Sequence, residues 1–190
     1  VGIALVDEAL HLGIDLLRGR LGERLAAAHR HAQEDLFLVV AIGDQAELVF
    51  RKGLEHERAH LQQLRERGLT VAEIELEDGD WERAREETLA ALRTGVDVVY
   101  QAALVGDGWR GVADFLMRVE TPSALGAWSY EALDTKLARH AKPTYVLQLC
   151  FYAEAIAAIQ GAPPEAMHVL LGIGERRTLR RVCSAHGCSG

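Results

Sequence analysis

With 190 residues, 49% of them hydrophobic and 26% charged, the chain has the composition of one globular domain that buries a real core. The formal net charge of −7 argues against binding of nucleic acid over the whole surface, although a local basic groove is compatible with it. No apolar run reaches the roughly 20 residues that span a bilayer, and three cysteines do not make a disulfide framework, so we expect a cytoplasmic protein without a membrane partner.

Residues 1–45 are rich in Ala and Leu and predict a helical N-terminal extension, with a candidate strand at 36–42. Residues 46–67 predict the strongest helix of the chain, and Gly68 ends it. The apolar side chains of this helix recur at helical spacing and predict one buried stripe: Phe50, Leu54, Leu61 and Leu64.

The middle of the chain predicts a strand, a helix and then a hairpin. The first strand is expected at 71–76 and the amphipathic helix at 81–93. Two further strands, 96–104 and 109–119, flank the tripeptide Gly-Asp-Gly at 106–108. Such a tripeptide between two apolar runs is typical of a tight turn, so we expect the two strands to pair antiparallel.

The last third of the chain predicts a strand, a helix and a final strand. The first of these strands covers 128–137. Pro143 suits the start of an apolar helix over 144–160, and Gly161 ends that helix. The final strand is expected at 167–171. The order of elements therefore predicts a mixed α/β fold, with a mixed sheet flanked by helices.

Acidic and basic side chains gather in two of these strands. Asp114 lies in the second strand of the predicted hairpin, and Asp134 and Lys136 end the next strand. Because side chains alternate along a strand, Asp134 and Lys136 share one face and Thr135 faces the other. Mg²⁺ is commonly bound by one or two carboxylates together with water and phosphate. The pattern therefore favours a magnesium site that acts on a phosphodiester.

The helix over 46–67 adds a further carboxylate. Glu57 falls inside the apolar stripe, three residues after Leu54 and four before Leu61. A charge at such a position is costly unless a partner meets it, and a metal ion or Lys136 would be that partner. His56 lies about 100° round the helix and is the alternative metal ligand.

Two polar residues stand out in the apolar helix over 144–160. Gln148 and Tyr152 are four residues apart and therefore lie on one face. They imply specific partners, such as substrate phosphate or the metal-binding residues.

Each feature of the predicted site has an ordinary explanation when taken alone, such as a surface ion pair, a turn residue or an exposed helix glutamate. Their order and spacing together favour one site.

That ordered set resembles the RecB-like branch of the PD-(D/E)XK nuclease superfamily, over about residues 46–175. The stretches that carry the resemblance are ELVFRKGLEHE, VVYQAALVGDGWRGVADFL, WSYEALDTKLARHAKPTYVLQLCFYAE and IQGAPPEAMHVLLG. The resemblance implies a restriction-endonuclease-like core of a helix, three strands, a helix and a strand. It also implies a metal-dependent DNA nuclease, exonuclease-like, that acts in repair or recombination and often with a helicase partner.

The resemblance further implies a role for each residue of the two strands. Asp114 would be one acidic ligand of Mg²⁺ or Mn²⁺, and Asp134 would be the second. The backbone carbonyl of Thr135 would also face the ion, and Lys136 would be the catalytic lysine.

The helices would complete that set. Gln148 and Tyr152 match the Gln-x-x-x-Tyr motif of the family. Many relatives carry a His four residues after the helix glycine, where this chain has Glu57, and His56 precedes it. We favour Glu57 as the ligand on helical geometry.

Some relatives hold a [4Fe–4S] cluster through one cysteine upstream and three downstream of the core. Here no cysteine precedes Cys150, and Cys183 and Cys188 are spaced C-x₄-C, so we expect no cluster. A zinc site that adds His186 is an equally weak alternative. We expect Cys150 to be a core residue.

The predicted organisation is an N-terminal extension at 1–45, a nuclease domain at 46–175 and a basic tail at 176–190 that is truncated or altered. Basic residues at 136–142 directly follow the predicted site and suit contact with the DNA backbone. Two rival hypotheses remain open. One is an inactive nuclease-like scaffold that binds DNA or a helicase, and the other is a metal-dependent phosphoesterase for small substrates.

Overall fold

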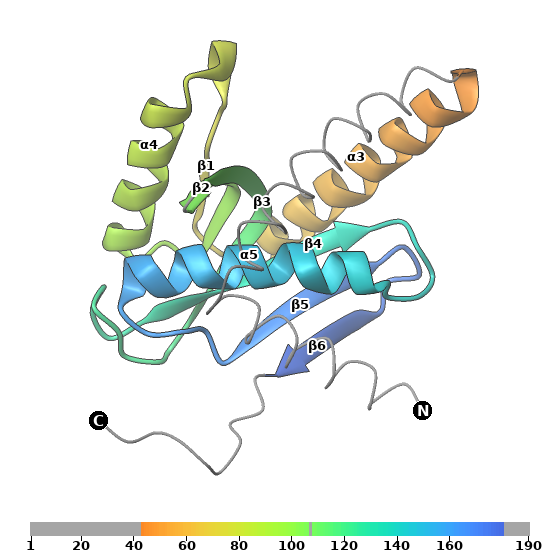
Figure 1. Cartoon of the computed structure of the whole chain (residues 1–190). Helices are drawn as coiled ribbons and strands as arrows, with labels where there is room; N and C mark the ends of the chain where they lie inside the picture. The colour runs from red at the N-terminus through yellow and green to blue at the C-terminus, as the bar shows by residue number, and fades with distance from the viewer. Residues whose placement is uncertain (1–42, 107, 181–190) are drawn as a thin grey trace.

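The structure is a computed structural model that describes residues 43–106 and 108–180. Residues 1–42 of the predicted extension, including its candidate strand at 36–42, lie outside these residues, as do the cysteines and the histidine of the predicted C-terminal tail. The described part is a mixed α/β fold with one six-stranded sheet. Figure 1 shows how the helices lie around this sheet.

The strands follow one another across the sheet in chain order. The β1–β2 and β4–β5 pairs are parallel, and the other neighbouring pairs are antiparallel. The strands are β1 (Val71–Glu73), β2 (Val98–Gly106), β3 (Trp109–Val119), β4 (Ser129–Lys136), β5 (Ala166–Leu171) and β6 (Arg176–Arg180). The predicted hairpin and the mixed sheet are therefore confirmed.

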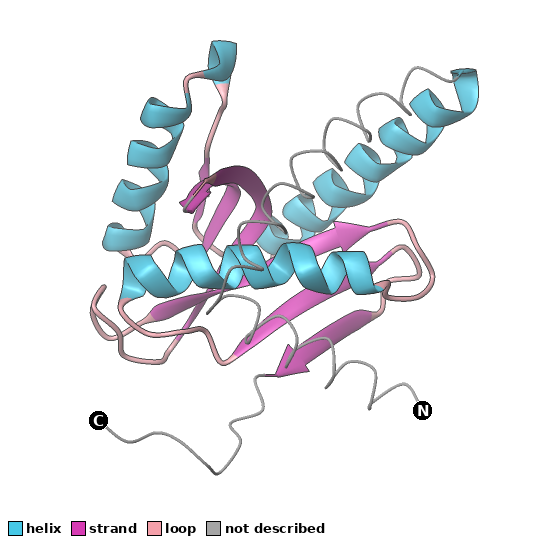
Figure 2. Ribbon diagram, in the orientation of Figure 1, coloured by secondary structure: helices cyan, strands magenta, loops and turns pink. Residues whose placement is uncertain are grey.

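Three helices pack against the sheet: α3 (Gly43–Glu66), α4 (Trp81–Thr94) and α5 (Pro143–Gln160). A 3₁₀ turn, η1 (Glu77–Gly79), precedes α4. Because parallel neighbours need a crossover connection, α4 links β1 to β2 and α5 links β4 to β5. Residues of α4 and α5 share one core cluster with the sheet, whereas α3 packs in a separate cluster. The sheet is thus covered by helices on both faces (Figure 2).

The ends of α4 and α5 follow their local sequence. The Asp80 carboxylate accepts a hydrogen bond of 3.1 Å from the Arg83 amide and caps α4, and Gly95 ends that helix in the left-handed region. Pro143 occupies the first turn of α5, and Gly161 ends it with a φ of 72°. None of the described helices combines the length and apolar character needed to cross a bilayer.

The apolar stripe of α3 is buried over only part of its length, which corrects one prediction. Leu61 and Leu64 are buried against the sheet, but Phe50 is 64% exposed and Leu54 is half-buried. The reason is geometric, because the sheet meets α3 near the C-terminal end of the helix, where Leu64 and Phe115 share one cluster. Helical periodicity predicts a face and does not predict how far a sheet extends beneath it.

The sheet also extends past the predicted domain boundary at residue 175. The sequence predicts a basic tail for residues 176–180, but they form β6 and pair with β5. A buried network holds this edge, because the His168 ring contacts the Thr178 hydroxyl at 3.1 Å and the Glu131 carboxylate at 2.9 Å. Only Leu179 of β6 is buried, which is why an Arg-rich edge strand has the sequence of a tail.

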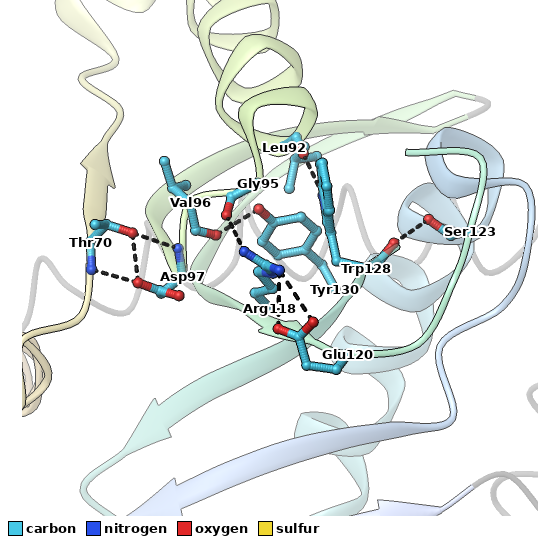
Figure 3. A network of polar contacts seen from close by, with 10 residues as sticks. All are labelled: Thr70, Leu92, Gly95, Val96, Asp97, Arg118, Glu120, Ser123, Trp128 and Tyr130. Carbon is cyan, nitrogen blue, oxygen red and sulfur yellow. Dashed lines mark hydrogen bonds and ion pairs between the residues drawn. The ribbon is translucent and has the colours of Figure 1, made fainter. Parts of the chain in front are cut away.

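A second polar network fixes the connection between α4 and β2, at the far end of β3 and β4 (Figure 3). The Arg118 guanidinium donates to the Gly95 carbonyl at 2.9 Å and lies over the Trp128 ring. The Tyr130 hydroxyl donates to the Val96 carbonyl at 2.7 Å. The Asp97 carboxylate accepts the Thr70 amide at 2.8 Å. Because these bonds satisfy the backbone of a crossover loop, they fix the sheet that carries the site.

Candidate metal and phosphodiester site

The candidate site lies where β3 and β4 separate. Their antiparallel pairing runs from Val119 opposite Ser129 to Phe115 opposite Leu133 and goes no further. Beyond that point β3 pairs only with β2, and the end of β4 pairs with β5. The β2–β3 hairpin curls away from β4–β6 (Figure 2). This fork opens at the positions of Asp114 and Asp134.

The carboxylate of Asp114 bridges the fork. Its Oδ2 atom accepts the Thr135 backbone N–H and the Thr135 hydroxyl, each at 2.7 Å. The Asp114 side chain thus takes the place of the backbone partner that a continued ladder would offer to Thr135. The amide and the hydroxyl of Thr135 are thus engaged with Asp114, and the role of its carbonyl as a metal ligand stays a prediction.

Asp134 is the most deeply buried charged group of the site, with a side chain only 1% exposed. Its Oδ2 atom lies 2.6 Å from the Lys136 ammonium, whereas no hydrogen-bond partner is described for Oδ1. Burial, and then the charge of Asp114, raise the pKa of Asp134 to about 7, although Lys136 opposes that shift. A buried carboxylate oxygen without a partner fits a cation ligand.

Lys136 reaches the same place from the end of β4. Its side chain is 23% exposed, so the ammonium lies between the buried Asp134 and solvent. It also lies 5.4 Å from the ring centroid of Tyr145, in the first turn of α5. Charge attraction on one side and the aromatic face on the other fix the position of the amine.

Glu57 joins this group from α3. It is buried, and its carboxylate accepts hydrogen bonds from the Tyr100 hydroxyl and the Gln101 side-chain amide. Burial and the nearby charge of Asp114 raise the pKa of Glu57, and these two hydrogen bonds oppose the rise. The structure thus brings Glu57 next to Asp114, with Lys136 close enough to stabilise its charge.

His56, the alternative ligand on α3, has different neighbours from Glu57. Its Nε2 atom is buried without a described hydrogen-bond partner, and its electrostatic neighbour is His60, one turn later on α3. The ring of His60 in turn packs edge-on against Phe115, with centroids 5.1 Å apart. The structure thus associates His56 with His60 and Glu57 with Asp114, which favours Glu57 as the ligand on α3.

Gln148 and Tyr152 meet as predicted. The Gln148 amide donates to the Tyr152 hydroxyl at 2.7 Å, and that hydroxyl donates to the Val112 carbonyl at 2.7 Å. The Tyr152 ring also lies against Gly111, where an added Cβ would come within 3.2 Å of the ring. These contacts connect α5 to the segment of β3 that carries Asp114.

We predict that Tyr152→Phe weakens both the fold and the site. The change removes the donor to Val112 and leaves the Gln148 amide without its acceptor, at a cost of about 1–3 kcal/mol in the free energy of unfolding. Urea unfolding would measure this cost. Tyr145→Phe is the matched control, because it keeps the ring over Lys136, and its unfolding should stay within about 0.5 kcal/mol of wild type. Equal effects of the two changes would contradict the assigned role of the Tyr152 hydroxyl.

As they stand, residues 43–106 and 108–180 contain no cluster of three His, Cys, Asp or Glu side chains arranged to hold a metal ion. The carboxylates of Glu57, Asp114 and Asp134 nevertheless influence one another electrostatically. The arrangement fits a divalent cation through oxygen ligands, because Asp134 retains a buried oxygen without a partner.

Cys150 is the one cysteine of the described residues, and it is half-buried on α5. Burial raises the pKa of its thiol to about 11, which suits a packed residue better than a metal-bound thiolate. The predicted alternative site at Cys183, His186 and Cys188 lies outside the described residues.

Tyr100 and Gln101 belong to the site and were not predicted from the sequence. Both contact Glu57 from β2. A signal was present, because Gln101 interrupts the apolar run Val-Val-Tyr-Gln-Ala-Ala-Leu in a central strand. A polar residue at such a position needs a specific partner.

Comparisons of this chain with protein-family models, with curated proteins and with solved structures return no significant match.

Proposed function

We propose that the protein is a metal-dependent DNA nuclease of the PD-(D/E)XK type, with a RecB-like site. The observation that carries the proposal is the buried Asp134 carboxylate, which has one oxygen without a partner and Lys136 at 2.6 Å from the other. The element order from α3 through β2, β3, β4, α5 and β5 agrees with the core that the resemblance implies. Carboxylates beside an amine at a sheet fork suit phosphodiester hydrolysis.

Asp114, Asp134 and Glu57 would hold Mg²⁺ or Mn²⁺ through carboxylate oxygens. Such an ion, when bound, acidifies water and neutralises charge on the phosphate. The three carboxylates, from α3, β3 and β4, repel one another electrostatically, and burial together with this repulsion raises the pKa of both Glu57 and Asp134. A cation would relieve this repulsion, which gives the site a thermodynamic reason to bind one.

Lys136 would act on the phosphate and on the attacking water. Its ammonium is held by Asp134 and by the Tyr145 ring, and its partial exposure leaves it accessible to a phosphate oxygen. A fixed ammonium stabilises negative charge that develops at phosphorus in the transition state. Gln148 and Tyr152 would support this geometry by holding β3 against α5.

The DNA backbone would lie along the loop that follows β4. Arg139, His140 and Lys142 are exposed there, immediately beyond Lys136. Basic side chains next to the cleaving groups suit phosphate contacts, which position nucleic acid without reading its sequence. Cleavage should therefore weaken steeply as salt is raised, in contrast to turnover of a small phosphodiester. A helicase domain or subunit is the proposed partner.

A nuclease-like scaffold without activity is the second candidate. It is favoured by the ion pair of Asp134 and Lys136, which neutralises this carboxylate without a metal. Calorimetric titration with Mn²⁺ separates the two candidates, since a scaffold has no need to bind the ion.

We expect purified protein to degrade linear DNA in Mn²⁺, and Lys136→Ala to reduce the rate by about 10²- to 10³-fold. Asp114→Ala should reduce it similarly and should also weaken Mn²⁺ binding. Lys52→Ala is the matched control, because this lysine is 59% exposed on α3 and pairs only with Glu55 among the described ion pairs. Equal rates of DNA cleavage for wild type and Lys136→Ala would contradict the proposed catalytic role of Lys136.

A further inference from the structure

Gln101 has a backbone conformation that its position in a strand does not explain. Its φ is 56°, in the left-handed region that residues with a side chain seldom adopt. Among the described residues only Asp78, in the 3₁₀ turn, shares this feature without being glycine. Outliers of this kind persist only where the surrounding structure maintains them, and they gather at functional sites.

The distortion lies directly across from Asp114. Tyr100 pairs with Phe115 and Ala102 pairs with Ala113, but the two residues between them, Gln101 and Asp114, leave the ladder. The register is the same on both sides, so each strand has one residue out of the pairing. The distorted residue of β2, Gln101, therefore lies opposite Asp114, whose carboxylate bridges the fork.

The regular alternation of side chains between the two faces of the sheet is interrupted at this point of the hairpin. Tyr100 and Gln101 are neighbours on β2 and yet both contact Glu57, on the side of α3. On β3, Ala113 lies in the core cluster of α4 and α5, and Phe115, two residues later, lies in the cluster beneath α3. Regular alternation would give the opposite result in both cases. The strained backbone thus redirects the side chains at the fork.

The Gln101 side chain has a specific partner there. Its amide nitrogen donates to the Glu57 carboxylate, on the helix that covers the sheet. Glu57 lies beside Asp114, so a neutral donor can hold it without adding a charge that would compete for the other carboxylates. Tyr100 donates to the same carboxylate from the preceding position of β2, and the two oxygens of a carboxylate still have lone pairs for a cation.

We propose that Gln101 is a positioning residue, which uses its left-handed backbone to hold the Glu57 carboxylate at the Asp114/Asp134 site for a divalent cation. This inference rests on the proposed function. It assigns a role to β2, from which neither the sequence pattern nor the resemblance supplies a residue. The closest analogy in metal sites is a hydrogen-bonding partner that orients a ligand, whose loss typically weakens metal binding by 10- to 100-fold.

The experiment compares Gln101→Gly with Gln101→Ala. Glycine adopts the left-handed conformation freely and alanine does not, but neither has an amide. We expect Gln101→Gly to melt at or above the temperature of wild type without metal, and Gln101→Ala to melt below it. Both should bind Mn²⁺ about 10-fold more weakly in calorimetry. Gln101→Asn, which tolerates the backbone and keeps a shorter amide, should recover part of the affinity.

A double-mutant cycle with Glu57→Ala tests whether Gln101 affects Mn²⁺ binding through Glu57. If Gln101 acts through Glu57, Gln101→Gly should weaken Mn²⁺ binding in the wild-type background and have no further effect in Glu57→Ala. Unchanged affinity of Gln101→Gly, in a wild type that binds Mn²⁺, would overturn the inference and leave the nuclease proposal intact. Failure of the wild type to bind Mn²⁺ would overturn both. Equal melting of the glycine and alanine variants would contradict the role of the backbone.

Discussion

Asp134→Asn should abolish DNA cleavage, by at least about 10³-fold, and at the same time stabilise the metal-free protein. The loss follows because the proposed site loses its most buried acidic ligand. The gain follows because burial and Asp114 disfavour the charged form of Asp134, and asparagine carries no charge while its oxygen can still accept from Lys136. We expect a gain of about 1–3 kcal/mol at pH 8, measured by urea unfolding in EDTA.

Asp97→Asn is the matched control, because this carboxylate has the opposite environment. Hydrogen bonds from Thr70 lower the pKa of Asp97, so the charged form stabilises the fold. The same chemical change should therefore destabilise the protein at position 97 and leave the affinity for Mn²⁺ intact. If Asp134→Asn destabilised the fold as Asp97→Asn does, the Asp134 carboxylate would be a structural group and the proposed metal site would be wrong.

The stability of the metal-free protein should fall as the pH rises from about 4 to about 7. The folded protein binds the Asp134 proton more tightly than the unfolded chain does, because the pKa is raised from its ordinary value of 3.8 to about 7. The stabilisation that this proton gives to the folded state is complete below the ordinary pKa of 3.8, and it is lost as the pH rises through the raised pKa of about 7. A rise of the pKa from 3.8 to about 7 corresponds to an upper bound of about 4 kcal/mol in the free energy of unfolding.

Mn²⁺ should reverse this trend, since a bound cation favours the ionised carboxylates. Binding should strengthen toward pH 8 and release protons, which calorimetry in buffers of different ionisation enthalpy would measure. Urea unfolding at pH 5 and pH 8, in EDTA and in Mn²⁺, gives the corresponding stabilities. Asp134→Asn should remove most of the slope in EDTA. An unchanged slope in that variant would show that another group titrates.

Much of the secondary structure follows from local patterns. The hairpin of β2 and β3 is evident from two apolar runs around Gly-Asp-Gly, and the limits of α5 follow from Pro143 and Gly161. Such signals act within a few residues, so a sequence is sufficient to predict them. The meeting of Gln148 with Tyr152 is equally local, because four residues along a helix are always neighbours.

The errors arise where burial depends on distant parts of the chain. Phe50 has the periodicity of a core residue but lies beyond the part of α3 that meets the sheet. Residues 176–180 have the composition of an exposed tail but complete the sheet as β6, because β5 offers them a backbone edge. Backbone pairing makes few demands on the side chains of an edge strand.

Local sequence patterns are sufficient to predict the order of the elements up to β5 and the residue types of the site: a carboxylate in α3, another in β3, and an acid followed two residues later by a lysine in β4. Where those groups meet depends on the tertiary structure. The separation of β3 from β4 places Asp114 against Thr135, and the left-handed backbone of Gln101 within β2 brings a donor to Glu57. Both depend on strand register and on which face a side chain takes, and a single residue of distortion reverses that face.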